Sequence, residues 1–157
     1  MSRKVLFVTS NRIGDCVISS GIIREIARQV PGAQITVACG RPPATPALEA
    51  AGPRGIDCVG KGDILCSAAA IDRAALFVGN DSGLMHVAAA AGKPTLGLFG
   101  PTEWWLYGPR GPRTAIAASN PNRGQFAPIE ALTTQRVFEA VLALHDTWID
   151  ASDPATP

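Results

Sequence analysis

The stretch LFVGNDSGLMHVAAAAGKPTLGLF, residues 76–99, decides the fold class of this chain. An apolar run at 76–78 leads through a turn of small residues into a helical pattern over 82–91. A second apolar run follows at 95–99. Short continuous apolar runs are typical of parallel strands covered on both faces. The stretch therefore predicts a β-α-β unit.

The same alternation occurs on either side of this stretch. Residues 5–8 and 35–38 predict strands, and residues 15–30 predict an amphipathic helix that Pro31 and Gly32 end. The other predicted elements are a helix at 67–73, a strand at 115–118 and a helix at 134–148. We expect an α/β fold, a Rossmann-like parallel sheet with flanking helices.

Residues 40–62 are rich in Gly and Pro, and we expect a linker or loop there. This divides the chain into residues 1–60, a β-α-β fragment, and residues 61–150, a second Rossmann-like portion. Residues 151–157 would form a flexible tail. Whether the strands merge into one sheet or form two lobes stays open at this point.

The bulk composition excludes several classes of protein. Hydrophobic residues make up 46% and charged residues 17% of 157 residues, with a formal net charge of +1. Neither disorder nor nucleic-acid binding fits these values. The apolar run near the N-terminus stops at Thr9, too short for a signal peptide or a membrane span, so we expect a cytoplasmic protein.

Asp81, Ser82 and Gly83 join a predicted buried strand to a helix, at the carboxyl end of the strand, where open α/β sheets bind ligands. Asp81 could cap the helix, or the free N–H groups of the first turn could bind a diphosphate. Both interpretations fit the residue types. His86 follows within two turns, although a single histidine is more often packed or solvated than a ligand contact.

Two further turns could join the same site. Gly100 and Thr102 follow the next strand, and Thr102 could add a hydroxyl to a phosphate; otherwise this is a plain Gly-Pro turn. Asp15 follows Gly14 at the start of the first helix. It could act as a general base or serve only as a cap.

Other chemistries are not indicated. The sequence has no G-x-G-x-x-G at the first helix, no Walker A motif and no G-x-S-x-G elbow. It also lacks an Asp-x-Asp pair and a Cys-x-x-Cys pair, so we predict no metal site and no cofactor. Trp104, Trp105 and Tyr107 could stack on a sugar or base, or pack their loop onto the core.

Both ends of the chain resemble the signature segments of glycosyltransferase family 9, whose best-known members are the ADP-heptose:lipopolysaccharide heptosyltransferases. The front resemblance runs over residues 4–35 through Ile13-Gly14-Asp15. The back resemblance runs almost continuously over residues 76–109, through Gly79-Asn80-Asp81-Ser82-Gly83, His86, Lys93-Pro94-Thr95 and Phe99-Gly100-Pro101-Thr102.

The resemblance implies a GT-B architecture, in which an acceptor domain and a nucleotide-sugar domain face each other across a cleft. Residues 1–60 would be the acceptor-side fragment and residues 61–150 the nucleotide-sugar side. It also implies a metal-independent, inverting transfer of a sugar, heptose in the best-known members, to a lipid-linked saccharide acceptor at the cytoplasmic face of the inner membrane. The implied roles are Asp15 as catalytic base, Asp81 near the donor sugar, and Ser82, Gly83, His86, Gly100 and Thr102 as further donor-binding residues.

The chain departs from the family pattern chiefly by what it lacks around residues 55–66. The rest of the first domain and the opening half of the second are missing, so the resemblance implies a shortened GT-B architecture. Gly21 and Tyr107 are minor departures, where the family usually has Pro and Trp. Apolar faces left without partners would favour self-association.

Three functional hypotheses follow. The first is an active sugar transferase with peripheral membrane contact. The second is an inactive remnant that at most binds a nucleotide diphosphate or a protein partner. The third, suggested only by Asp-Ser-Gly, is an esterase with Ser82 as nucleophile and His86 as base.

Overall fold

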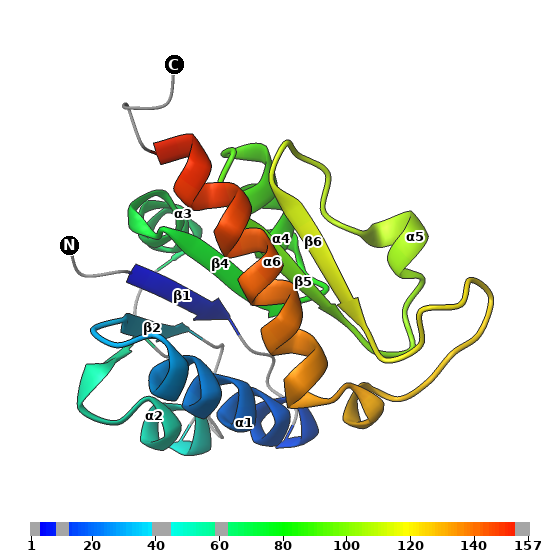
Figure 1. Ribbon diagram of the computed structural model, residues 1–157, viewed down its shortest axis with the longest axis horizontal. Coiled ribbons are helices and arrows are strands. Elements are labelled where there is room, and N and C mark those ends of the chain that lie inside the picture. The colour runs from blue at the N-terminus through cyan, green and yellow to red at the C-terminus, as the bar shows by residue number, and fades with distance from the viewer. Residues whose placement is uncertain (1–3, 9–12, 39–44, 59–62, 153–157) are drawn as a thin grey trace.

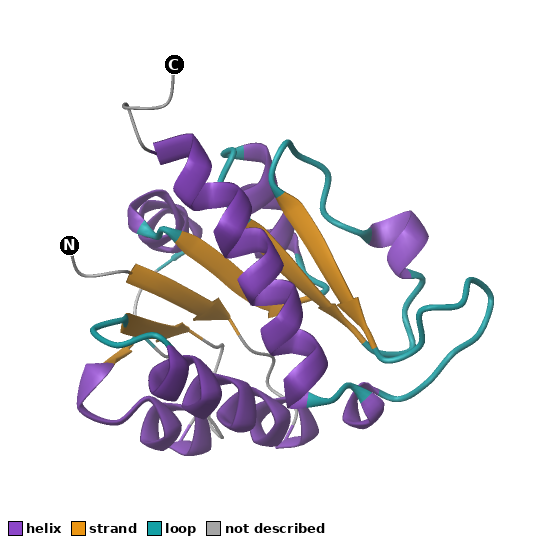
Figure 2. Ribbon diagram, in the orientation of Figure 1, coloured by secondary structure: helices purple, strands orange, loops and turns teal. Residues whose placement is uncertain are grey.

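The chain folds around one parallel sheet of six strands in the order β3-β2-β1-β4-β5-β6 (Figures 1 and 2). The computed structural model describes residues 4–8, 13–38, 45–58 and 63–152, with side chains except at 13–18, 45, 46, 48 and 145–152. The strands are β1 (Lys4–Val8), β2 (Gln34–Ala38), β3 (Gly55–Asp57), β4 (Leu76–Asn80), β5 (Thr95–Phe99) and β6 (Thr114–Ala118). The helices are α1 (Ile13–Gln29), α2 (Thr45–Ala51), α3 (Ile64–Arg73), α4 (Gly83–Ala90), α5 (Trp104–Tyr107) and α6 (Thr134–Ser152).

Helices cover both faces of the sheet, because the central strands are apolar on both sides. Alternate residues of β1 point to opposite faces: Val5 and Phe7 join one core cluster, whereas Leu6 and Val8 join the other. Helices α1, α2 and α6 cover the first face, and α3 and α4 the second (Figure 1). These layers confirm the predicted α/β class and Rossmann-like sheet.

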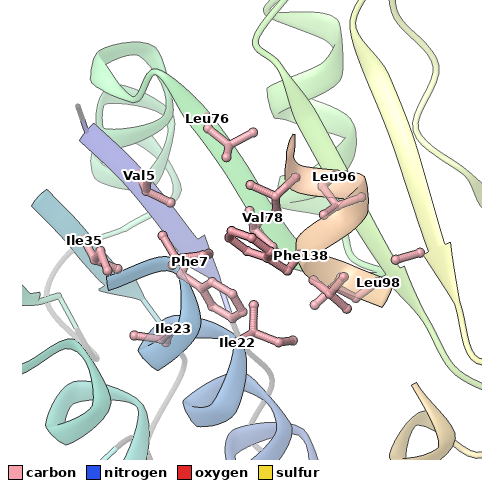
Figure 3. Close-up of a cluster of buried hydrophobic side chains, with 14 of the residues drawn as sticks. Val5, Phe7, Ile22, Ile23, Ile35, Leu76, Val78, Leu96, Leu98 and Phe138 are labelled. Carbon is pink, nitrogen blue, oxygen red and sulfur yellow. The ribbon is translucent and has the colours of Figure 1, made fainter. Parts of the chain in front are cut away.

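The larger core cluster lies between the sheet and helices α1 and α6 (Figure 3). Strand residues such as Phe7 and Val78 meet Ile22 of α1 and Phe138 of α6, all of them almost completely buried. Helix α6 also packs directly on α1, where Gly21 leaves room for it: a Cβ at Gly21 would lie 3.1 Å from Thr134 Oγ1. Gly21 is therefore accounted for by helix packing.

The pairing of β1 with β4 joins the two halves of the chain. Residues Val5–Val8 pair in parallel register with residues 76–79, and the Ala75 N–H donates to the Lys4 carbonyl at 2.8 Å. Residues 1–60 and 61–150 thus contribute three described strands each to a single sheet. The question of one sheet or two lobes is settled in favour of one sheet.

The structure corrects the prediction of a linker at residues 40–62. Within this range it places α2, a 3-10 turn at Gly52–Arg54 and the edge strand β3, which pairs with β2. Arg54 holds this segment to α1 by donating to the carbonyls of Ala27 and Val30. The other predicted strands and helices are present with ends shifted by a few residues, and α6 extends to Ser152. Residues 153–157 of the predicted tail lie outside the described residues.

Substitution of Phe77 tests the core cluster beneath α3 and α4, because the Phe77 side chain has no exposed surface. We expect Phe77→Ala to lower the free energy of unfolding by about 3–5 kcal/mol, through lost burial and the cavity left behind. Urea unfolding followed by circular dichroism measures this. Leu142→Ala, at a leucine that is 41% exposed on α6, should change it by only about 0.5 kcal/mol. Equal losses in the two variants would contradict this description of the core.

Candidate functional site

The candidate site lies where the strand order reverses, between β1 and β4. From β1 the chain crosses through α1 to β2, and from β4 it crosses through α4 to β5 on the other side. The two connections diverge at the carboxyl ends of adjacent strands, and such a switch point is where open α/β sheets form a ligand crevice. Asp15, the third residue of α1, and Asp81, between β4 and α4, flank it.

Helix α4 begins without a side-chain cap. Its N-cap residue is Ser82, which has an extended backbone (φ −163°, ψ 162°) and makes no side-chain capping hydrogen bond. Of the two alternatives for Asp81, the structure does not support the helix cap, because the helix starts one residue later than that role requires. The Met85 N–H donates to the Ser82 carbonyl at 3.1 Å. Among the described residues, the N–H groups of Gly83 and Leu84 have no backbone acceptor.

Two buried oxygens on either side of Asp81 lack hydrogen bonds. Asn80 Oδ1 and Ser82 Oγ are both inaccessible to solvent and have no partner in the described part of the chain. A buried polar group left unsatisfied costs about 1–3 kcal/mol, so proteins rarely keep one without a use. The Asn80 amide was not among the predicted contacts; its position at the end of an apolar strand is the signal that could have indicated it.

Of the other predicted donor-site residues, some are exposed and one is required by packing. Gly83 and His86 are exposed on α4, and a Cβ built at Gly83 would meet no atom within 4 Å. Thr102 is exposed beyond β5, and β5 does lie beside β4, as expected. Gly100 has a packing reason, because a Cβ there would lie 2.8 Å from Ile129 Cβ. The side chain of Asp15 lies outside the described residues.

The Ser82–His86 pair required by the esterase hypothesis is not formed. Ser82 Oγ is buried and makes no hydrogen bond within the described residues, whereas His86 is exposed. A serine nucleophile needs its base within hydrogen-bond reach. The structure therefore contradicts an esterase built on these two residues.

The aromatic residues after β5 divide between packing and exposure. Trp104 packs against the core cluster beneath α3 and α4, and its Nε1–H donates to the Asn120 carbonyl at 3.2 Å. Trp105 contacts Trp104 edge-on at a centroid distance of 5.7 Å and Phe126 at 6.4 Å. Residues 104–107, expected in a loop, form the short helix α5. Packing therefore accounts for Trp104, whereas Tyr107 is 49% exposed.

Two cavities open beside α3, and neither is lined by the predicted site residues. The site at the switch point therefore rests on the unsatisfied oxygens and uncapped N–H groups, not on a measured cavity. Within the described ranges, no group of three or more His, Cys, Asp or Glu residues is arranged to hold a metal ion. The described helices include none that is both long and apolar enough to cross a membrane.

Comparison with known proteins agrees with this fold. The family model of glycosyltransferase family 9 (heptosyltransferase) matches residues 24–130. The sequence has no significant match among curated proteins.

Several solved structures share the fold at low sequence identity. A family 9 glycosyl transferase from Veillonella parvula superposes with a TM-score of 0.75 at 21% identity, covering 95% of this chain and 46% of that one. Escherichia coli ADP-heptose lipopolysaccharide heptosyltransferase II gives 0.75 at 20% identity, covering 97% and 48%. E. coli heptosyltransferase WaaC with ADP gives 0.71 at 20% identity, covering 91% and 44%. The chain thus spans slightly less than half the length of these proteins, in keeping with the predicted shortened GT-B architecture.

Substitutions at two glycines distinguish a position that is closely packed, Gly100, from one that faces open space, Gly83. Gly100→Ala should lower the free energy of unfolding by about 1–3 kcal/mol, because its Cβ would press on the Ile129 side chain and backbone. Gly83→Ala should leave this free energy unchanged or raise it by up to about 1 kcal/mol, because space is open and alanine favours a helix. Urea unfolding compares the variants, and a larger loss for Gly83→Ala would show that this position is packed.

Proposed function

Since this chain belongs to glycosyltransferase family 9 (heptosyltransferase), we propose that it transfers a sugar from a nucleoside diphosphate sugar to a saccharide acceptor. The donor we propose is ADP-heptose, and the acceptor a lipid-linked saccharide of the lipopolysaccharide type. The observation that carries the proposal is the buried Ser82 hydroxyl, which has no partner among the described residues, at the uncapped start of α4. The fold shared with a heptosyltransferase solved with ADP supports it.

In this proposal the start of α4 binds the diphosphate. The N–H groups of Gly83 and Leu84 point along the helix axis, where the helix dipole favours negative charge. Rotation of the Ser82 side chain would let its hydroxyl donate to a phosphate oxygen and end its unsatisfied state. His86 and Thr102, both exposed, extend the donor site along α4 and from the loop after β5, beside Gly100. Asp81 would accept hydrogen bonds from donor sugar hydroxyls.

The proposed reaction is a single displacement with inversion. The acceptor hydroxyl oxygen attacks the anomeric carbon of the donor, and a new glycosidic bond forms as the bond to the phosphate oxygen breaks. The hydroxyl proton passes to the Asp15 carboxylate, and the nucleoside diphosphate leaves with the bonding electrons. The N–H groups of α4 stabilise the negative charge that develops on the leaving phosphate, so the proposed step needs no divalent cation.

The arrangement of the two acidic residues supports this assignment. Because β1 and β4 are neighbours, α1 with Asp15 and the turn with Asp81 start from the same edge of one sheet. In a GT-B enzyme the catalytic base and the donor site lie on two domains that face each other across a cleft. In this chain Asp15 and the donor site would lie in one crevice at the edge of a single sheet. We place the reaction at the cytoplasmic face of the inner membrane, with the protein in peripheral contact.

The second candidate function is binding without transfer. It is favoured by the gap around residues 55–66, where this chain lacks the middle segments of the family pattern. Such a remnant would keep the start of α4 and hold a nucleoside diphosphate, without a complete acceptor site.

Calorimetric titration with ADP tests the donor site. We expect the wild-type protein to bind, and Ser82→Ala to weaken binding by roughly 10–100-fold, the loss of one hydrogen bond to a charged group. Urea unfolding of Ser82→Ala should show no loss of stability, because the hydroxyl is buried without a partner.

Asp81→Ala should lower the rate of transfer from ADP-heptose more than it weakens the binding of ADP alone. Glu139→Ala, exposed on α6, is the control. Folded wild-type protein that does not bind ADP would contradict both candidate functions.

Transfer from ADP-heptose to a lipid-linked saccharide acceptor separates the two functions. Asp15→Asn should lower the rate by roughly 10²–10⁴-fold, the usual contribution of a general base, with ADP binding retained. The rate is followed by release of ADP. If wild-type protein binds ADP but transfers no sugar, binding without transfer is the function; transfer that survives in Asp15→Asn would exclude Asp15 as the base.

A further inference from the structure

A groove runs along the sheet beneath α3, on the face opposite α1 and α2. Its main cavity has a volume of about 400 Å³ and lies between α3 and the strands β1, β2 and β3. A second cavity of about 140 Å³ continues it and shares Leu6, Cys58, Cys66 and Ala70 with the first. Small-molecule pockets typically have a volume of about 300–1,000 Å³, so the groove is large enough for a ligand.

The strand register orders the groove from one end to the other. Lys4 and Gln34 are register partners at the amino ends of β1 and β2, and both line the main cavity. Leu6, Thr36 and Ile56 form the next level across three strands. Val8, Ala38 and Leu84 line the second cavity at the carboxyl edge of the sheet. The groove is therefore elongated along the strands.

Charge is distributed unevenly along this groove. Lys4 and Arg73 line the main cavity at the amino edge, and neither side chain forms an ion pair or hydrogen bond with the described residues. Arg73 is the last residue of α3 and Lys4 the first residue of β1, so both cations line the cavity at the amino edge of the sheet. The opposite end of α3 carries Asp63, which accepts from the N–H groups of Leu65 (3.0 Å) and Cys66 (2.9 Å). Asp63 is exposed and lines neither cavity, so among the lining residues Lys4 and Arg73 carry the charge.

The remaining lining is uncharged, and most of it is apolar. Beyond the two cations lie Leu6, Ile56, Ala69 and Ala70, together with the Cys58 and Cys66 thiols, which behave as small apolar groups. Ile56 is 40% exposed in the groove, so a ligand there would remove apolar surface from water.

We propose that this groove binds a single-chain anionic amphiphile, with its carboxylate or phosphate head between Lys4 and Arg73. The tail would extend along Leu6, Ile56 and Ala70 toward Leu84. Arg can bind a carboxylate or phosphate through two parallel hydrogen bonds, and Lys adds a point charge. Because both cations lie at the amino edge, they set the orientation of the ligand. This site does not depend on the proposed transferase function: the two sites meet only at Leu84, whose N–H group belongs to the proposed donor site and which lines the far end of the second cavity.

Dodecanoate, below its micellar concentration, is the probe, and binding is followed by calorimetry. We expect saturable binding that weakens at least roughly tenfold in the double variant Lys4→Gln/Arg73→Gln, because two ionic contacts to the head are lost. Arg110→Gln, which removes an exposed cation that lines neither cavity, should bind as the wild type does. Dodecyltrimethylammonium, which has the same tail and the opposite charge, should bind at least tenfold more weakly. Dodecyl phosphate should also bind, because the two cations recognise the negative charge of the head and not the carboxylate itself.

The location is tested by Ala70→Phe and by thiol protection. Ala70→Phe should abolish binding by filling the groove, with folding checked by circular dichroism. In the wild type, bound dodecanoate should slow alkylation of Cys58 and Cys66 by a maleimide, measured for each residue by mass spectrometry. The proposal is overturned if dodecanoate does not bind, if it binds the double variant as tightly as the wild type, or if both thiols alkylate at unchanged rates. Loss of ADP binding alone would leave it standing.

Discussion

The parallel pairing of β1 with β4 is the constraint on which the rest of the structure depends. It places Val5–Val8 and Leu76–Asn80, two of the most apolar segments, side by side at the centre of the sheet. It creates the switch point where α1 and α4 diverge. It also fixes the path of α3, which must return from the carboxyl end of β3 to the amino end of β4. In doing so α3 passes over β1 and leaves part of β2 and β3 uncovered, so the candidate donor site and the groove have the same origin.

The regular elements were predictable because their residues carry a local signal. The continuous apolar runs of β1, β4 and β5 and the four-residue spacing of α1 are visible in the sequence without any partner. Strand β3 carries no such signal: it has three residues, of which Ile56 and Asp57 are exposed, and it exists because β2 offers a free edge. Pairing between distant segments is set by tertiary context, and Gly and Pro around β3 favour a loop when judged locally.

The candidate site was predictable in its place but not in its details. A strand followed by Asp-Ser-Gly and a helix indicates a carboxyl-edge site, and the structure puts these residues beside the predicted loop after β5. Which residue begins the helix depends on backbone angles, and Ser82 rather than Asp81 holds that position. The unsatisfied state of Asn80 and Ser82 depends on what surrounds them in three dimensions. Likewise, Gly100 looks like a ligand-binding glycine in the sequence, whereas its neighbour in space is Ile129.

The distance in sequence between β1 and β4 has a consequence for synthesis. A nascent chain emerges from the ribosome N-terminus first, so the strand at Lys4–Val8 is complete long before its partner at Leu76–Asn80 exists. At ordinary translation rates this interval lasts roughly 4–14 s. During it, one edge of a strand whose last four residues are all buried in the folded protein has no partner. Helix α6, which closes the core over α1, arrives later still. Early contact with a chaperone would therefore protect a segment that only the second half of the chain can cover.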